Sequence, residues 1–104
     1  MHNITPNELI KKLNDDDNSF LLDVRSIEEY NESHIPESFL LNIRDPQSFM
    51  DGLENLDKSK NYYVYCHSGI RSTQACQIMK SFGFHNLFNL LGGISEWTGS
   101  LNYD

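Results

Sequence analysis

Short apolar runs alternate with segments of helical spacing along the chain, and turn residues lie between them. The first run, at residues 19–24, lacks clean alternation, as strands do when helices cover both faces of a sheet. Strands alternating with helices are typical of an α/β protein with a mainly parallel sheet. Strands are expected at residues 19–24, 39–43, 62–65 and 86–91.

Two of the expected helices begin at capping boxes, in which a hydroxyl residue precedes a glutamate by three positions. Thr5 and Glu8 form the first box, with Pro6 at the favoured first helical position. Ser26 and Glu29 form the second box, at the start of a short helix. These boxes predict helices at residues 6–14 and 27–31. Two further helices are expected at residues 46–50 and 73–82.

Length and charge restrict the classes of function. A chain of 104 residues fits a single domain, spanning residues 1–104. The formal net charge of -7 argues against general nucleic-acid binding, which needs a basic face. No apolar run approaches the length of a membrane span, and the first residues lack the basic and apolar regions of a signal peptide. These features predict a cytoplasmic protein with neither nucleic acid nor membrane as partner.

The chemistry is expected in the loop that follows the strand at residues 62–65. Cys66 begins this loop, Gly69 allows a tight backbone, and Ser72 is expected to cap the next helix. The backbone N–H groups of such a loop form an anion site that lowers the pKa of a thiol. Arg71 adds a fixed positive charge suited to oxyanions. The alternative, an inert buried Cys66, is less favoured because cysteine, glycine and arginine share one strand-to-helix loop.

The second cysteine, Cys76, is expected in the core. Its spacing with Ala75, Met79 and Phe82 places it on the apolar face of the helix that Gly83 ends. The alternative, a resolving thiol for Cys66, is disfavoured because the helix points Cys76 away from the loop. The two cysteines do not form a Cys-x-x-Cys pair, and no Cys/His spacing resembles a zinc site, so no metal is expected.

Three segments together resemble the rhodanese-like domains of the sulfurtransferase superfamily. Residues 66–71, Cys-His-Ser-Gly-Ile-Arg, are similar to the family's six-residue active-site loop. Residues 23–30 with His34-Ile35-Pro36 resemble its N-terminal signature, and residues 91–94 with Trp97 resemble its C-terminal one. The resemblance implies the rhodanese-like α/β fold, with Cys66 as catalytic nucleophile. It assigns substrate binding to His67, Ser68, Gly69, Ile70 and Arg71, and structural support to Asp23, Arg25 and Ser72.

The resemblance implies sulfur transfer through a cysteine persulfide, with no cofactor. A sulfane sulfur would pass from thiosulfate, a polysulfide or a low-molecular-weight persulfide to cyanide or to a thiol, which a protein could carry. Cysteine-dependent phosphatases have one residue more between Cys and Arg, and the shorter loop is the one associated with sulfur chemistry. The alternative is a module that senses persulfides or carries sulfur between proteins without turnover.

Some residues depart from the family's pattern. Ser33 stands where a glycine often precedes the histidine, and Glu37-Ser38 replaces a small Gly-Ala pair. His34 is interpreted as a structural histidine, and Asp23 as part of a charged tie between loops rather than a catalytic acid. Family members that react efficiently with thiosulfate often carry more than one basic residue in this loop. Because only Arg71 is permanently charged here, the resemblance implies a weak reaction with thiosulfate.

Overall fold

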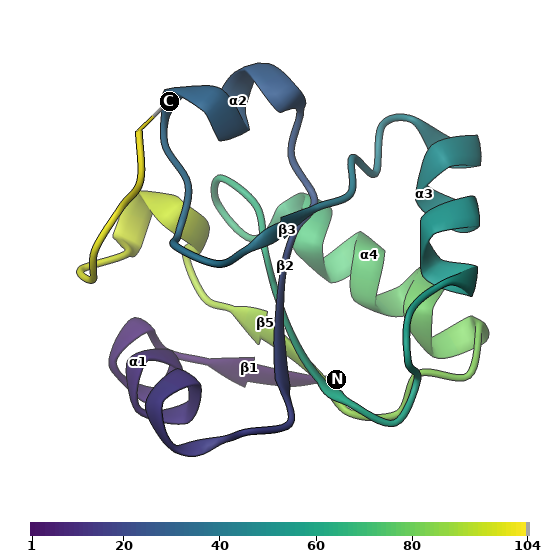
Figure 1. Cartoon of the computed structure of the whole chain (residues 1–104), viewed down its shortest axis with the longest axis horizontal. Coiled ribbons are helices and arrows are strands. Elements are labelled where there is room, and N and C mark those ends of the chain that lie inside the picture. Colours follow the sequence, from purple (N-terminus) through teal and green to yellow (C-terminus); the bar gives the residue numbers. More distant parts are fainter. Residues whose placement is uncertain (104) are drawn as a thin grey trace.

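One parallel sheet organises the protein (Figure 1). The computed structural model describes residues 1–103. Within this range five strands are ordered β1-β5-β4-β2-β3, and every pairing between them is parallel. The strands are β1 (His2–Ile4), β2 (Ser19–Asp23), β3 (Phe39–Leu40), β4 (Asn61–Tyr65) and β5 (Leu87–Leu90). The carboxyl ends of parallel strands share one edge of the sheet, where ligands bind in open α/β folds.

Helices cover both faces of the sheet, which confirms the expected α/β architecture. They are α1 (Pro6–Asp15), α2 (Ile27–Glu32), α3 (Pro46–Glu54), α4 (Ile70–Ser81) and the 3-10 helix η1 (Gly93–Glu96). In Figure 1, α3 and α4 lie on one side of the sheet, and α1 and η1 lie on the other. None of the helices within residues 1–103 combines the length and the apolarity needed to cross a bilayer.

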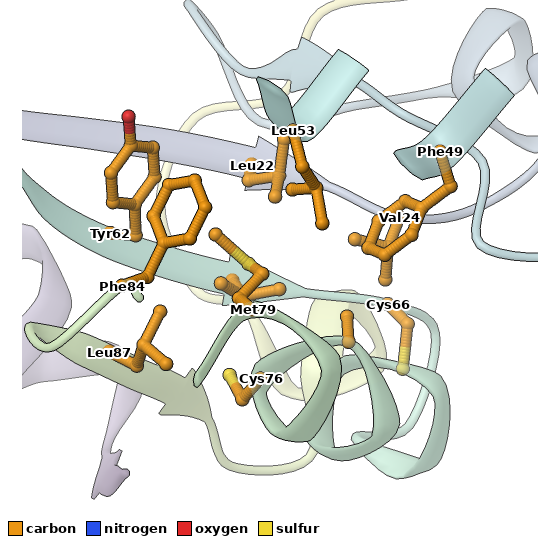
Figure 2. Close-up of a cluster of buried hydrophobic side chains, with 12 residues drawn as sticks. Leu22, Val24, Phe49, Leu53, Tyr62, Cys66, Cys76, Met79, Phe84 and Leu87 are labelled. Atoms are coloured by element: carbon orange, nitrogen blue, oxygen red, sulfur yellow. The ribbon is translucent and has the colours of Figure 1, made fainter. Parts of the chain in front are cut away.

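The central strand β4 supplies side chains to the cores on both faces. Tyr62, Val64 and Cys66 belong to the cluster that includes the buried residues of α3 and α4. Figure 2 shows this cluster, with Tyr62 at one end and Cys66 at the other. Tyr63 and Tyr65 alternate with them and join the cluster beneath α1. Burial on both faces stabilises this strand, with each enclosed large side chain contributing about 2 kcal/mol.

The helix starts agree with the capping signals in the sequence. Thr5 Oγ1 accepts a hydrogen bond from Glu8 N at 3.2 Å, and Glu8 Oε1 accepts one from Thr5 N at 2.9 Å. Ser26 and Glu29 make the same reciprocal pair at the start of α2. At the other end of α4, Gly83 has a φ of 94°, the left-handed conformation expected of a helix-terminating glycine.

The structure departs from the expected elements in several places. β1 was not expected, because two of its three residues are polar and it forms no apolar run. β3 covers only two of the five residues expected, although Leu41 N still donates to Asp23 O at 2.8 Å. α3 continues past Gly52 to Glu54. A Cβ at Gly52 would collide with the Leu41 side chain, so this glycine allows α3 to pack closely.

The turn after Pro36 places a charged side chain in an unfavourable backbone conformation. Glu37 has a φ of 68°, is exposed, and occupies one of the positions where the family often has small residues. We expect Glu37→Gly to stabilise the protein by about 0.5 kcal/mol, since relief of left-handed strain exceeds the added entropy of the unfolded chain. Urea denaturation would measure this gain. Glu28→Gly, inside α2, should instead be destabilising, and a loss of stability in Glu37→Gly would contradict the argument.

Candidate active site

Cys66 lies at the carboxyl end of β4, at the start of the loop that leads into α4. Only 1% of the residue is exposed. The N-cap of α4 is Gly69, whose φ of 109° is accessible to glycine at little cost. Ser72 therefore does not cap this helix, contrary to the expectation. It lies within the first turn of α4, where its side chain points toward Cys66 rather than to the end of the helix.

Several hydrogen-bond donors surround the Cys66 sulfur. Gly69 N donates to Sγ at 3.0 Å, and the backbone N–H groups of Ser68 and Ser72 add to it. Burial raises the pKa of the Cys66 thiol, but hydrogen bonds from Ser72, Gly69 and Ser68 outweigh burial and hold the pKa below its usual value. The site therefore favours the thiolate, which is the nucleophilic form of cysteine.

The helix η1 fixes the direction of two loop carbonyls and therefore of the N–H groups of His67 and Ser68. Ile94 N donates to Cys66 O at 2.9 Å, and Ser95 N donates to His67 O at 3.1 Å. Because the carbonyl and the N–H of one peptide point in opposite directions, turning these carbonyls toward η1 turns the following N–H groups away from it. Gly93 makes this contact close: a Cβ there would overlap the carbonyl atoms of Cys66 and His67.

A chain of polar side chains extends from the buried sulfur to the exposed edge of the sheet. Cys66 Sγ and Ser72 Oγ are 3.5 Å apart, and Ser72 Oγ donates to Asn89 Oδ1 at 2.5 Å. Asn89 Nδ2 in turn donates to Asn3 Oδ1 at 3.2 Å. Residues 3 and 89 are paired in register between β1 and β5. The sequence analysis did not identify either asparagine; the one available signal was the polar Asn89 within an apolar strand.

Arg71 is not a free cation. Its Nη1 and Nη2 donate to the two carboxylate oxygens of Glu29 at 2.7 and 2.8 Å. Hydrogen bonds from Arg71 are the main reason that the pKa of Glu29 is lowered to about 2. The same glutamate closes the capping box of α2. The expectation of a single loop cation was therefore incomplete, since Arg71 is paired with a carboxylate 42 positions earlier in the chain.

Asp23 and Arg25 form a buried ion pair, as expected of a structural tie. Arg25 Nη2 approaches Asp23 Oδ2 to 2.7 Å, and the same nitrogen donates to Ser33 O at 2.8 Å. The pair thus links the carboxyl end of β2 to the end of α2.

His34 also has structural contacts. Its backbone pairs with Asn102, and its Nδ1 lies 2.9 Å from Tyr30 O. The next residue, Ile35, is bound to β4, because its N–H donates a hydrogen bond to Tyr65 Oη at 3.1 Å. Burial is the main cause of the raised pKa of Tyr65, which therefore remains a neutral phenol. These contacts fix the segment between α2 and β3.

The remaining loop residues form the surface around the sulfur. His67 and Ser68 are exposed, and Ile70 is 70% exposed. A groove of about 640 Å³ lies elsewhere, between α1, the start of β2 and residues 35–39, and does not include the loop. The loop residues His67, Ser68 and Ile70 are therefore exposed around the site, whereas Cys66 itself is buried.

Cys76 occupies the core position predicted for it. It lies on the buried face of α4, and burial raises the pKa of its thiol to about 12. Both cysteines are free thiols, and Figure 2 shows Cys76 within the apolar cluster. A neutral, enclosed thiol is a poor nucleophile, so the chemistry of the site rests on Cys66.

Comparisons with known proteins agree with this geometry. A family model described as "Rhodanese-like domain" matches residues 5–100. The putative sulfurtransferase YtwF of Bacillus subtilis is 35% identical over 91 residues, which cover 88% of this chain and 84% of YtwF. The putative sulfur carrier protein YrkF of the same organism is 36% identical over 89 residues, covering 86% of this chain but only 46% of YrkF. A crystal structure of a rhodanese-like domain protein from Staphylococcus aureus superposes with a TM-score of 0.87 at 28% identity, covering 100% of this chain and 99% of the other.

Proposed function

The chain belongs to the rhodanese-like domain family, and from this membership we propose that it is a sulfurtransferase that forms a persulfide on Cys66. The observation that carries the proposal is the buried sulfur with its ring of N–H donors at the carboxyl end of β4. These donors stabilise negative charge on sulfur, which both the resting thiolate and the persulfide carry. The relative named a putative sulfurtransferase supports the same activity.

The first half of the reaction loads sulfur onto the protein. The Cys66 thiolate attacks the sulfane sulfur of thiosulfate, a polysulfide or a small persulfide. A new S–S bond forms as the S–S bond within the donor breaks, and the donor remnant leaves with the electron pair. For thiosulfate this remnant is sulfite. The product is a Cys66 persulfide held by the N–H groups of Ser68, Gly69 and Ser72.

The second half returns the protein to its resting state. An acceptor thiolate or cyanide attacks the outer sulfur of the persulfide. The bond between that sulfur and Cys66 Sγ breaks, and Cys66 recovers the electron pair as a thiolate. Because His67, Ser68 and the apolar Ile70 are exposed around the site, a protein that carries the acceptor thiol could dock against this loop.

The pairing of Arg71 with Glu29 bears on the choice of donor. A bidentate carboxylate largely offsets the charge that would attract a doubly charged donor. We therefore expect a weak affinity for thiosulfate, and saturation in the micromolar range would contradict this. Small organic persulfides, which carry one charge at the sulfur end where thiosulfate carries two, are the donors that the site suits better.

The variant Glu29→Gln tests this effect of charge. Removing the carboxylate charge while keeping an acceptor oxygen should lower the KM for thiosulfate by roughly 3- to 10-fold, because Arg71 becomes available to the donor. The KM for a small organic persulfide, which carries less charge, should change much less. Steady-state kinetics with both donors measure the difference, and Glu28→Gln, one residue away, is the matched control. An equal change in the two glutamine variants would argue against a specific role of the pair.

A second candidate function is a module that carries or senses sulfur without turnover. It is favoured by the exposed side chain of Ile70 in the loop and by the relative named a putative sulfur carrier protein. The chain spans about half the length of that relative, so the remainder of YrkF has no counterpart in the comparison. Both functions share the loading step and differ in whether the protein releases sulfur repeatedly to a small acceptor.

Intact-protein mass spectrometry tests the proposal. After brief exposure to thiosulfate, or separately to glutathione persulfide, the mass should rise by one sulfur atom, and cyanide should remove it. Repeated release of product to cyanide supports the enzyme, whereas one loading with slow release supports the carrier. No gain of sulfur from either donor, in folded protein with a free Cys66 thiol, would overturn both readings.

A further inference from the structure

Two acceptors near Cys66 compete for one hydroxyl hydrogen, that of Ser72. Ser72 Oγ is fully buried and carries one hydrogen, which it donates to Asn89 Oδ1. When Cys66 is a thiol, its S–H can donate to Ser72 Oγ, and every group is satisfied. When Cys66 is a thiolate, two acceptors, the sulfur and Asn89 Oδ1, face one hydroxyl hydrogen. The sulfur already accepts a hydrogen bond from Gly69 N, but a charged sulfur gains more from a further donor than a neutral amide oxygen does, so ionisation favours turning the Ser72 hydrogen toward the sulfur.

We propose that Ser72, Asn89 and Asn3 form a hydrogen-bond relay that reverses direction when Cys66 ionises, and that Asn89 and Asn3 are positioning residues for the nucleophile. This inference rests on the proposed role of Cys66 and adds the residues that set its charge state. It differs from the support expected of Ser72, which was the capping of α4.

The reversal requires rotations only. The thiol proton leaves to solvent or buffer, and the Ser72 hydroxyl turns so that its hydrogen points to the sulfur. The Asn89 amide rotates by half a turn, so that its Nδ2 donates to Ser72 Oγ and its Oδ1 faces Asn3. The Asn3 amide, which lies at the exposed edge strand β1, turns to present its own Nδ2. Each acceptor again has a donor, and no covalent bond other than S–H is broken.

The register of the sheet makes this relay continuous. Asn3 of β1 is paired with Asn89 of β5, and Asn89 is paired with Val64 of β4, two residues before Cys66. Asn89 is 4% exposed, whereas Asn3 reaches solvent. A change at the surface of β1 can therefore alter which group Asn89 presents to Ser72, although Asn3 does not touch the sulfur.

The charged groups at the site do not offer another route for this coupling. Arg71 on α4 interacts with the Cys66 charge, and Glu29 on α2 pairs with Arg71. His67 is the other titratable residue of the loop and is exposed. None of these three has a hydrogen bond to Asn89 or Asn3 among the bonds of residues 1–103.

Titration of Cys66 in the folded protein, without any sulfur donor, tests the relay. The thiolate can be followed by its ultraviolet absorbance and by its rate of alkylation against pH; Cys76, with a pKa of about 12, does not interfere at lower pH. Ser72→Ala should raise the pKa of Cys66 by about one unit, through loss of a donor to a charged sulfur. Asn3→Asp should raise it by about half a unit, because a carboxylate only accepts and holds Asn89 in the orientation suited to the thiol.

His2→Asp is the matched control, since it adds the same charge one residue away on β1, where the side chain has no hydrogen bond to Asn89 among those of residues 1–103. An exposed charge acts through space and is screened by salt, whereas the orientation of Asn89 is not. The Asn3→Asp shift should therefore persist near 1 M salt while any His2→Asp shift disappears. Equal shifts in the two variants at high salt, or an unchanged pKa in Ser72→Ala, would overturn the relay. Sulfur loading of the unmodified protein is a separate measurement, so failure of the proposed function would be recognised independently.

Discussion

Replacing Cys66 with serine is expected to abolish sulfur loading and to leave the fold intact. Serine is close in size, so the cluster around β4 should remain packed, and the N–H groups of the loop can bond its oxygen. A hydroxyl, however, does not ionise near neutral pH as a thiol does, and it cannot form a persulfide. We expect the rate of loading to fall by roughly a thousand-fold or more, to the background of the measurement.

Intact mass after exposure to glutathione persulfide measures this loss, and circular dichroism verifies that the variant is folded. Cys76→Ala is the matched control, because it removes the only other thiol from the buried face of α4. It should still load one sulfur atom, although the small cavity would lower stability by about 1 kcal/mol. Loading that required Cys76, or that continued in Cys66→Ser, would contradict the assignment of the nucleophile.

The second large effect is expected from Gly93→Ala, a substitution outside the loop itself. Gly93 has a φ of 60°, and a Cβ there would overlap the backbone carbonyls of Cys66 and His67. Backbone atoms cannot move aside as a flexible side chain can, so η1 must separate from the loop. We expect a loss of about 3 kcal/mol in the free energy of unfolding, combining left-handed strain with overpacking.

The same substitution should also slow sulfur loading, because the donors Ile94 N and Ser95 N would no longer hold the loop carbonyls. Gly92→Ala is the matched control. Its φ of 73° carries similar strain, but its Cβ would meet the side chain of Glu96 rather than the loop backbone: Cγ can turn away, and Cβ must shift slightly. Gly92→Ala should lose about 1 kcal/mol and keep most of its loading rate. Equal loading rates in the two variants would show that the contact of η1 with the loop is not needed.

Local signals in the sequence were sufficient for much of the fold. The capping boxes of Thr5 and Ser26 each involve residues three positions apart, and both are present. The position of Cys66 at the end of a buried strand and of Cys76 in the core also follow from nearby residues. In each case the interaction that decides the structure lies within one or two turns of chain, where spacing alone is informative.

The features that were not predicted depend on contacts between distant segments. The carboxylate that neutralises Arg71 belongs to Glu29, which was interpreted only as a helix cap. Serine is a residue type that often caps helices, but Gly69 is the N-cap of α4, and the Ser72 hydroxyl donates to Asn89 instead. β1 has no apolar pattern because it is an edge strand, and its pairing with β5 becomes apparent only when the sheet is assembled.

The order of the strands has a consequence for how the protein folds. β1 pairs with β5, so the first strand has no partner until residues near the other end of the chain have been synthesised. The loop carbonyls likewise obtain their donors from η1, which follows β5. Non-local pairings of this kind are formed late and slowly. We expect the surroundings of Cys66 to be complete only when β5 and η1 have joined the sheet, so the pKa of its thiol should reach its lowered value late in folding.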